Sequence, residues 1–148
     1  RRGAVFAESS FARQIAEIEL ERAAPVIQVG NLDAIRDFSD VREVIQAYLL
    51  LLERGVSGAT YNVCSGKGIA MREILKALVA LSTVKVEIHV DPSRLRPSDL
   101  PVLVGDPSKL RAATGFAPSG VLDQALADLL FDWRAAGERG KKMEARHS

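Results

Sequence analysis

The sequence predicts a mixed α/β fold, and two kinds of pattern indicate it. Apolar residues recur at helical spacing over 41–52, 71–82 and 121–136. The shorter segments 26–29 and 84–90 are instead continuously apolar or alternating, as strands are. The chain has 148 residues, of which 47% are hydrophobic, so it is long enough for one domain with a core.

The first half of the chain is expected to begin with a helix followed by a short strand. Ser10 can cap a helix over 11–23 that places Phe11 and Ile15 on one face. The apolar segment 26–29 follows as a strand.

The second predicted helix is the most regular element of the sequence. Ser39 or Asp40 can cap it, and Gly55 ends it. Its members share one apolar face, which is expected to point inward: Val41, Val44, Ile45, Tyr48, Leu49 and Leu52. The segment 59–65, "ATYNVCS", then has the composition of a strand.

The second half is expected to alternate in the same way. A helix is predicted over 71–82, and the alternating segment 84–90 is predicted to be a strand at or near a sheet edge. Asp106 can cap a short helix that has proline at its first position. A last helix is predicted over about 121–136, and the remaining 137–148 have no apolar period and are expected to form a flexible tail.

Composition excludes several classes of function. The 20 basic and 19 acidic residues leave a net charge of +1, so no nucleic-acid partner is expected. A single cysteine allows no internal disulfide, and the two histidines have no metal-site spacing with it, so no metal is expected and a reducing cytoplasmic setting is predicted. The longest apolar run, 48–52, is too short to cross a membrane, so no membrane partner is predicted.

The stretch "TYNVCSGKGIAMREIL" has two interpretations. A strand-like segment followed by Gly66, Gly68 and a helix is close to a dinucleotide-binding fingerprint, which would predict NADP binding through these glycines. The third glycine position is occupied by Met71, and no second βαβ half follows. A plain connection between strand and helix is the favoured alternative.

Arginines suggest a different kind of anion site. Arg94 and Arg96 can point the same way in an extended segment before Pro97, where two guanidinium groups could hold a diphosphate. The alternative that these residues alone favour is a solvated loop in which the arginines pair with Asp91 and Asp99. The pair Arg36–Asp37 is similarly open: Asp37 could help to cap the next helix, or it could fix Arg36 so that the guanidinium faces an anion.

No catalytic residue is predicted in this sequence. Cys64 lies in a strand pattern and is expected to be a small buried residue, and His89 is expected to be solvated. Neither Tyr48 nor Tyr61 is followed by lysine four residues later, so no Tyr-x-x-x-Lys pair is present.

With these motifs in place, the chain resembles the C-terminal half of extended short-chain dehydrogenase/reductases that act on nucleotide sugars. It is most similar to GDP-mannose 4,6-dehydratase and to GDP-4-keto-6-deoxymannose reductase. The stretches that carry the resemblance run in family order: "RRG" at 1–3, "GNLDAIRDFSDV" at 30–41, "YNVCSGK" at 61–67, "REIL" at 72–75, "RLRPSDLPVLVGDPSKL" at 94–110 and "ATGFAP" at 113–118.

The resemblance implies roles for five residues. Arg36 and Arg96 would lie along the substrate diphosphate, Asn31 and Asp99 would also bind the substrate, and Arg2 would reach the phosphate of NADP. The dehydratases carry a lysine near the position of serine 10, a departure that leaves the choice between dehydratase and reductase open.

The resemblance also implies what the chain is. Residues 1–136 would be the substrate-binding domain, lacking most of the Rossmann domain, with about 39–65 supplying a helix and a strand of the Rossmann sheet. The whole enzyme would be a cytoplasmic, NADP-dependent homo-oligomer that moves a hydride to or from the C4 of a GDP-sugar. The glycine-rich loop and the Tyr-x-x-x-Lys pair are absent here, so the chain alone is expected to be inactive. The alternative is a non-catalytic module that binds a nucleotide diphosphate or takes part in assembly.

Overall fold

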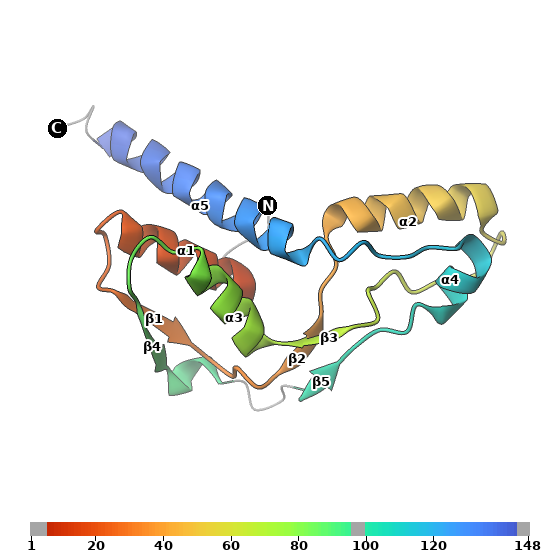
Figure 1. The fold of residues 1–148 in the computed structure, drawn as a ribbon, viewed down its shortest axis with the longest axis horizontal. Helices are drawn as coiled ribbons and strands as arrows, with labels where there is room; N and C mark the ends of the chain where they lie inside the picture. The colour runs from red at the N-terminus through yellow and green to blue at the C-terminus, as the bar shows by residue number, and fades with distance from the viewer. Residues whose placement is uncertain (1–5, 96–99, 145–148) are drawn as a thin grey trace.

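The computed structural model describes residues 6–95 and 100–144 as an elongated α/β molecule with two lobes (Figure 1). The first lobe contains three helices, α1 (Ala7–Glu19), α3 (Met71–Ala80) and α5 (Leu122–Glu144). α1 packs on β1 (Val26–Val29), which forms a parallel pair with β4 (Glu87–Val90), and α3 and α5 pack against α1 and against each other. We call these five elements the packed lobe.

The second lobe contains α2 (Val41–Arg54) and α4 (Ser108–Thr114), which pack against each other. We call these two helices, with the segment 55–67, the open lobe. A three-stranded sheet joins the lobes, in the order β3 (Gly68–Ala70), β2 (Ile35–Asp37), β5 (Val102–Leu103). β2 is antiparallel to β3 and parallel to β5. A short 3₁₀ helix, η1 (Pro92–Arg94), follows β4.

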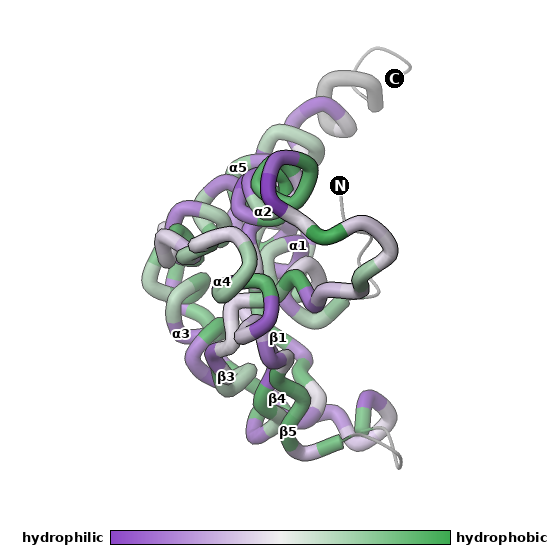
Figure 2. The backbone as a smooth tube through the Cα atoms, turned by 90° about the vertical axis from the view of Figure 1, so that its right-hand side faces the viewer, coloured by the Kyte–Doolittle hydropathy of each residue, from purple (hydrophilic) through white to green (hydrophobic). Residues whose placement is uncertain are grey.

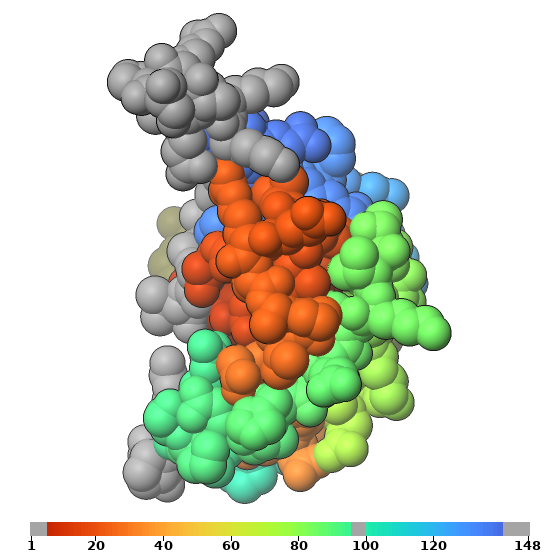
Figure 3. All heavy atoms as spheres, turned by 90° about the vertical axis from the view of Figure 1, so that its left-hand side faces the viewer, coloured from red at the N-terminus to blue at the C-terminus, as the bar shows by residue number. Residues whose placement is uncertain are grey.

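The main core lies in the packed lobe, where apolar side chains of α1, α3, α5 and β1 form one cluster. Its central side chains are fully or almost fully buried: Ile15, Ile27, Val29, Ile74, Leu75, Leu78, Leu126 and Leu130. In Figure 3 the red and orange residues of α1 and β1 lie directly against the green residues of β4. The helical periodicity in the sequence therefore predicts this core correctly.

A polar contact also joins the helices of this lobe. The Arg134 guanidinium donates to both carboxylate oxygens of Glu19, at 2.6 and 2.7 Å. The backbone amide and the hydroxyl of Thr83 donate to the same carboxylate. These bonds, with that of Arg134 first, hold the pKa of Glu19 below its usual value.

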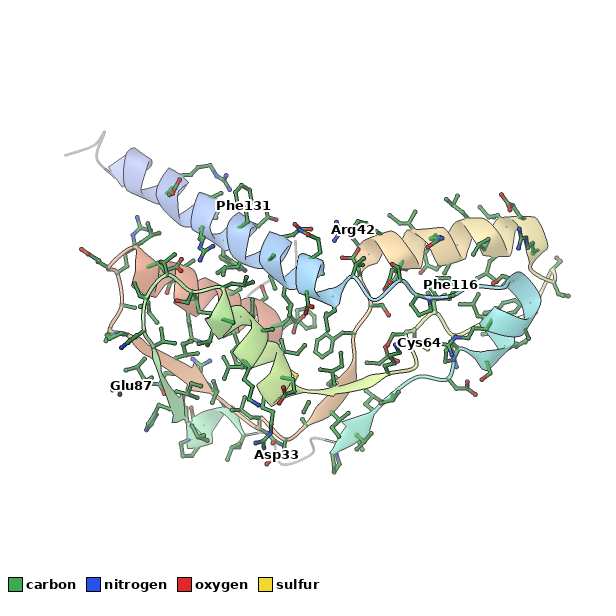
Figure 4. All side chains as sticks on the ribbon, viewed as in Figure 1. Asp33, Arg42, Cys64, Glu87, Phe116 and Phe131 are labelled. Carbon is green, nitrogen blue, oxygen red and sulfur yellow. The ribbon has the colours of Figure 1, made fainter. Side chains whose placement is uncertain are left out.

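The open lobe has a much smaller core, made of Ala47, Leu110 and Phe116. Phe116 lies between α2 and α4 (Figure 4). Asp40 caps α2 as predicted, because its Oδ1 accepts from the Arg42 amide at 2.7 Å. The α2 face that was expected to point inward is instead largely exposed: Val41, Ile45, Tyr48, Leu49 and Leu52. Figure 2 shows hydrophobic and hydrophilic residues alternating around this helix.

Several elements differ from the sequence prediction. The short strands β2 and β3 were not expected, and α4 begins at Ser108 with Pro107, not Asp106, at its N-cap position. The first helix begins at Ala7, before Ser10, and no side chain caps it. Residues 59–65 form no strand, since within the described chain no neighbouring strand lies beside them to accept a ladder of hydrogen bonds. α5 continues to Glu144, past residue 137 where a flexible tail was expected. Among the described residues β4 pairs with β1 alone, so its predicted position at a sheet edge is confirmed.

Candidate functional site

A cavity of about 720 Å³ lies where α1, β1, β2 and η1 come together. This volume is within the range of small-molecule sites in proteins. Its wall carries several side chains with charged or amide groups: Glu8, Gln28, Asn31, Arg36, Asp37 and Arg94. Aromatic surface is supplied by Phe6, Phe11 and Phe38. The cavity thus offers both charge and apolar area to a ligand.

Arg36 is the first predicted site residue that the structure places in this wall. It is the middle residue of β2, and its Nη1 donates to the carbonyls of Ile35 and Leu100, each at 2.8 Å. These two main-chain carbonyls fix the position of the guanidinium in the cavity wall. A guanidinium has several planar N–H donors and suits an anionic ligand.

Asp37 neither caps the next helix nor bonds directly to Arg36 in any contact that the structure describes; its carboxylate binds two loops. Its Oδ1 accepts from the amide and hydroxyl of Ser65, at 2.9 and 2.6 Å. Its Oδ2 accepts from the amides of Gly66 and Gly105, at 2.9 and 3.3 Å. Asp40, not Asp37, caps α2. The Asp37 carboxylate therefore ties β2 to two loops and fixes the strand from which Arg36 projects.

Asn31 also lies in the cavity wall. Its Oδ1 accepts from the Asp33 amide at 2.9 Å, which closes a tight turn between β1 and β2. No described residue accepts from its side-chain nitrogen. The structure thus brings Asn31 and Arg36 to one cavity from two neighbouring elements.

The other three predicted residues, Arg2, Arg96 and Asp99, lie outside the described residues. The structure does describe both flanks of the segment that carries Arg96 and Asp99. Arg94 lines the cavity on one side of that segment, and the Leu100 carbonyl contacts Arg36 on the other.

The two glycines of the possible dinucleotide fingerprint are explained by packing. Gly66 has a φ of +76°, and a Cβ there would lie 2.9 Å from Pro107. Its amide donates to Asp37 rather than pointing to open space. A Cβ on Gly68 would approach Ile35 and Val104 too closely. The described residues do not build a dinucleotide site here, so the plain-connection interpretation fits this structure.

Sequence reasoning did not find Glu8 and Gln28. Glu8 was missed because the first helix was predicted to start after Ser10. In the structure, Glu8 lies in the first turn of α1 and lines the cavity. Gln28 lies on β1, and its Oε1 is 2.8 Å from Nδ1 of His89. The sequence did contain one indication of this role, because Gln28 is the single polar residue in the apolar segment 26–29.

The described chain contains no evident catalytic or metal centre. Burial, and then the nearby Asp37 carboxylate, raise the pKa of the Cys64 thiol, so it is not an activated nucleophile. No cluster of metal-ligating side chains occurs among the described residues. In that same part of the chain, no helix is both long and apolar enough to span a membrane.

Comparison with known proteins agrees with this fold. The family model described as GDP-mannose 4,6 dehydratase matches residues 1–129. A GDP-6-deoxy-D-mannose reductase from Pseudomonas aeruginosa is 39% identical over 130 residues, which are 88% of this chain and 43% of that protein. A GDP-mannose 4,6-dehydratase from Vibrio cholerae is 24% identical over 160 residues, covering 88% of this chain and 42% of that protein.

A solved structure shows the same arrangement of elements. The structure of RMD from Pseudomonas aeruginosa complexed with NADPH aligns with a TM-score of 0.82 and 37% identity, covering 91% of this chain and 44% of that one. Fold, site and these likenesses define the class as extended short-chain dehydrogenase/reductases of nucleotide sugars. The chain belongs to the GDP-mannose 4,6 dehydratase family. It spans less than half the length of the relatives it matches.

Proposed function

We propose that this chain is the GDP-sugar-binding part of an NADP-dependent enzyme of the GDP-mannose 4,6-dehydratase or GDP-4-keto-6-deoxymannose reductase type. The observation that carries the proposal is the cavity of about 720 Å³ in which Arg36 and Asn31, two residues of the family motif, lie together. The name of the Pseudomonas relative, a GDP-6-deoxy-D-mannose reductase, supports the substrate class. Its structure with NADPH supports the cofactor.

The residues of the chain would act by positioning the substrate. Arg36, held by two carbonyls at 2.8 Å, would lie along the diphosphate, and Arg96 would join it there. Asn31 and Asp99 would hydrogen-bond the ligand, and Arg2 would contact the NADP phosphate. NADP, bound mostly outside this chain, would supply the hydride chemistry. Holding the diphosphate fixes where the hexose lies relative to the reacting centre, which is a large source of rate.

The division of the chain is part of the same proposal. Residues 1–136 would be the substrate-binding domain, and about 39–65 would complete the Rossmann sheet of the whole enzyme. Two observations support this: the apolar face of α2 is exposed, and residues 59–65, which have the composition of a strand, have no described partner strand. One neighbouring sheet could both pair with this segment and cover the apolar face of the helix. We propose a homo-oligomer in the cytoplasm for the whole enzyme.

Calorimetric titration with GDP tests the binding proposal. The wild-type chain should bind GDP, and the Arg36→Ala, Arg96→Ala double variant should lose about 2–4 kcal/mol of binding free energy, because each charge-assisted contact contributes roughly 1.5–3 kcal/mol and the two are not fully additive. Arg13→Ala is the matched control, since Arg13 pairs with Glu17 on α1 and does not line the cavity. Equal affinity in the double variant and the control would contradict the proposal.

The exposed α2 face favours a second candidate, a non-catalytic assembly module. Both candidates predict that the purified chain does not turn over a GDP-sugar with NADPH, because no catalytic group lies in its described part. They differ in GDP binding, which the assembly module does not require. Turnover by the chain alone would exclude both.

A further inference from the structure

Arg94 lies in the wall of the same cavity as Arg36, although the two come from different elements. Arg36 is on β2, and Arg94 is the last residue of η1 (Pro92–Arg94). The resemblance assigns the diphosphate contact in this region to Arg96, not to Arg94. The structure therefore presents a second guanidinium at the cavity that the proposed function does not use.

The Arg94 guanidinium has hydrogen-bond donors that are not used by the described residues. Its Nε donates to Oδ2 of Asp91 at 3.3 Å, and no described residue accepts from its two terminal nitrogens. The side chain is 41% exposed. Asp91 is itself shared, because its Oδ1 accepts from the amide and the hydroxyl of Ser93, at 2.9 and 2.7 Å. The guanidinium is thus anchored at one edge, and its other edge remains available to a planar anion.

The backbone places Arg94 as firmly as the side chain does. The Asp91 amide donates to the Val29 carbonyl, and the Arg94 amide closes η1 onto the Asp91 carbonyl at 3.0 Å. η1 approaches the end of β1 so closely that a Cβ on Gly30 would lie 2.7 Å from the Arg94 carbonyl oxygen. Glycine at position 30 is therefore what allows Arg94 to reach the cavity wall.

We infer that Arg94 is a second phosphate-binding guanidinium, which contacts the diphosphate of the nucleotide ligand together with Arg36. The inference rests on the proposed function and adds a residue to its site. The acidic groups of the same wall do not oppose it. Asp37 is occupied by amides and a hydroxyl, and Glu8 belongs to the α1 side of the cavity.

Titrations with GDP, inorganic pyrophosphate and guanosine test this inference on the whole chain. Arg94→Ala should weaken GDP and pyrophosphate binding about 10- to 100-fold, the loss expected from one charge-assisted contact, and should leave guanosine binding unchanged. Arg94→Lys should recover part of the loss, because lysine keeps the charge but not the planar fork. Arg13→Ala, in which a half-exposed arginine paired with one carboxylate is removed elsewhere, should bind as the wild type does.

Gly30→Ala provides an independent variant that keeps both arginines. It should weaken GDP binding because its methyl group displaces η1, whereas Gly140→Ala, at a helical glycine with only ordinary contacts, should not. If the wild type binds neither GDP nor pyrophosphate, the proposed function and this inference both fail. If the wild type binds GDP and Arg36→Ala weakens it, but Arg94→Ala equals Arg13→Ala, only the role of Arg94 is overturned.

Discussion

Helices α2 and α3 have similar sequence patterns and opposite surroundings. Both carry apolar residues at helical spacing, but Leu75 and Leu78 of α3 are buried, whereas Leu49 and Leu52 of α2 are mostly exposed, the latter by 84%. α3 meets α1 and α5 in the packed lobe, and α2 meets α4 along its other side. An amphipathic pattern therefore predicts that a helix has a partner, but it does not say that the partner is in the same chain.

The largest expected difference between the two helices is in stability. Leu78→Ala should lower the free energy of unfolding by about 2–5 kcal/mol, because it opens a cavity in the main core. Leu52→Ala should change it by no more than about 0.5 kcal/mol, because the side chain is already in solvent. Urea unfolding of both variants measures this. Equal losses would show that the open lobe has more packing than the comparison allows.

The exposed face of α2 should matter instead for assembly. We expect the chain to bind the N-terminal portion of the Pseudomonas reductase that precedes the matched segment, and a Leu49→Asp, Leu52→Asp variant should weaken this more than 100-fold. Uncovering two leucines costs about 3 kcal/mol or more. Co-purification followed by analytical ultracentrifugation gives the affinity. Phe131→Asp, at an exposed phenylalanine of α5, is the matched control and should have no effect.

The polar contact of the packed lobe should have a smaller effect that depends on pH. Arg134→Ala should lower the free energy of unfolding by about 1–3 kcal/mol at neutral pH, since it leaves Glu19 without its main donor. Because the pKa of Glu19 is lowered in the folded chain, this contribution is complete above pH 4.5 and is lost as the pH falls through the folded pKa. Thermal unfolding of both proteins from pH 7 to pH 3 should show the difference shrinking. A difference that stays constant would rule out this ion pair as its source.

The N-cap of α2 provides a test of how stable the open lobe is relative to the packed lobe. Asp40→Ala removes the bond to the Arg42 amide and should cost about 1 kcal/mol, whereas Asp40→Asn keeps an acceptor and should cost less. If the open lobe unfolds separately, the loss should appear as reduced hydrogen-exchange protection in α2 alone. Reduced protection in α3 as well would indicate that the two lobes unfold together.

Local sequence patterns were enough for most elements of the packed lobe. The positions of α3 and β4 and the start of α5 follow from apolar spacing, because in each case the partner surface lies within the chain. The same reasoning fails for the α2 face and for the strand expected at 59–65. Both need neighbours that a local pattern cannot supply.

The candidate site was predictable only in part. Arg36 and Asn31 line one cavity, but their contact with a substrate stays a prediction, as does the clamp considered for Arg94 and Arg96. Glu8 and Gln28 were not found, because their positions depend on where α1 begins and on which face of β1 meets the cavity. Such facts come from packing between distant segments and have no local signature.

The carboxylate of Asp37 has a mechanical consequence for the whole enzyme. It bonds the loop at Ser65 and Gly66, which directly follows the stretch proposed to enter the Rossmann sheet. A displacement of that loop must either stretch these bonds or shift β2, and Arg36 is the adjacent residue on β2. The Asp37 side chain thereby couples the completion of the neighbouring sheet to ligand binding by Arg36. If that sheet is not completed, the ligand should bind more weakly.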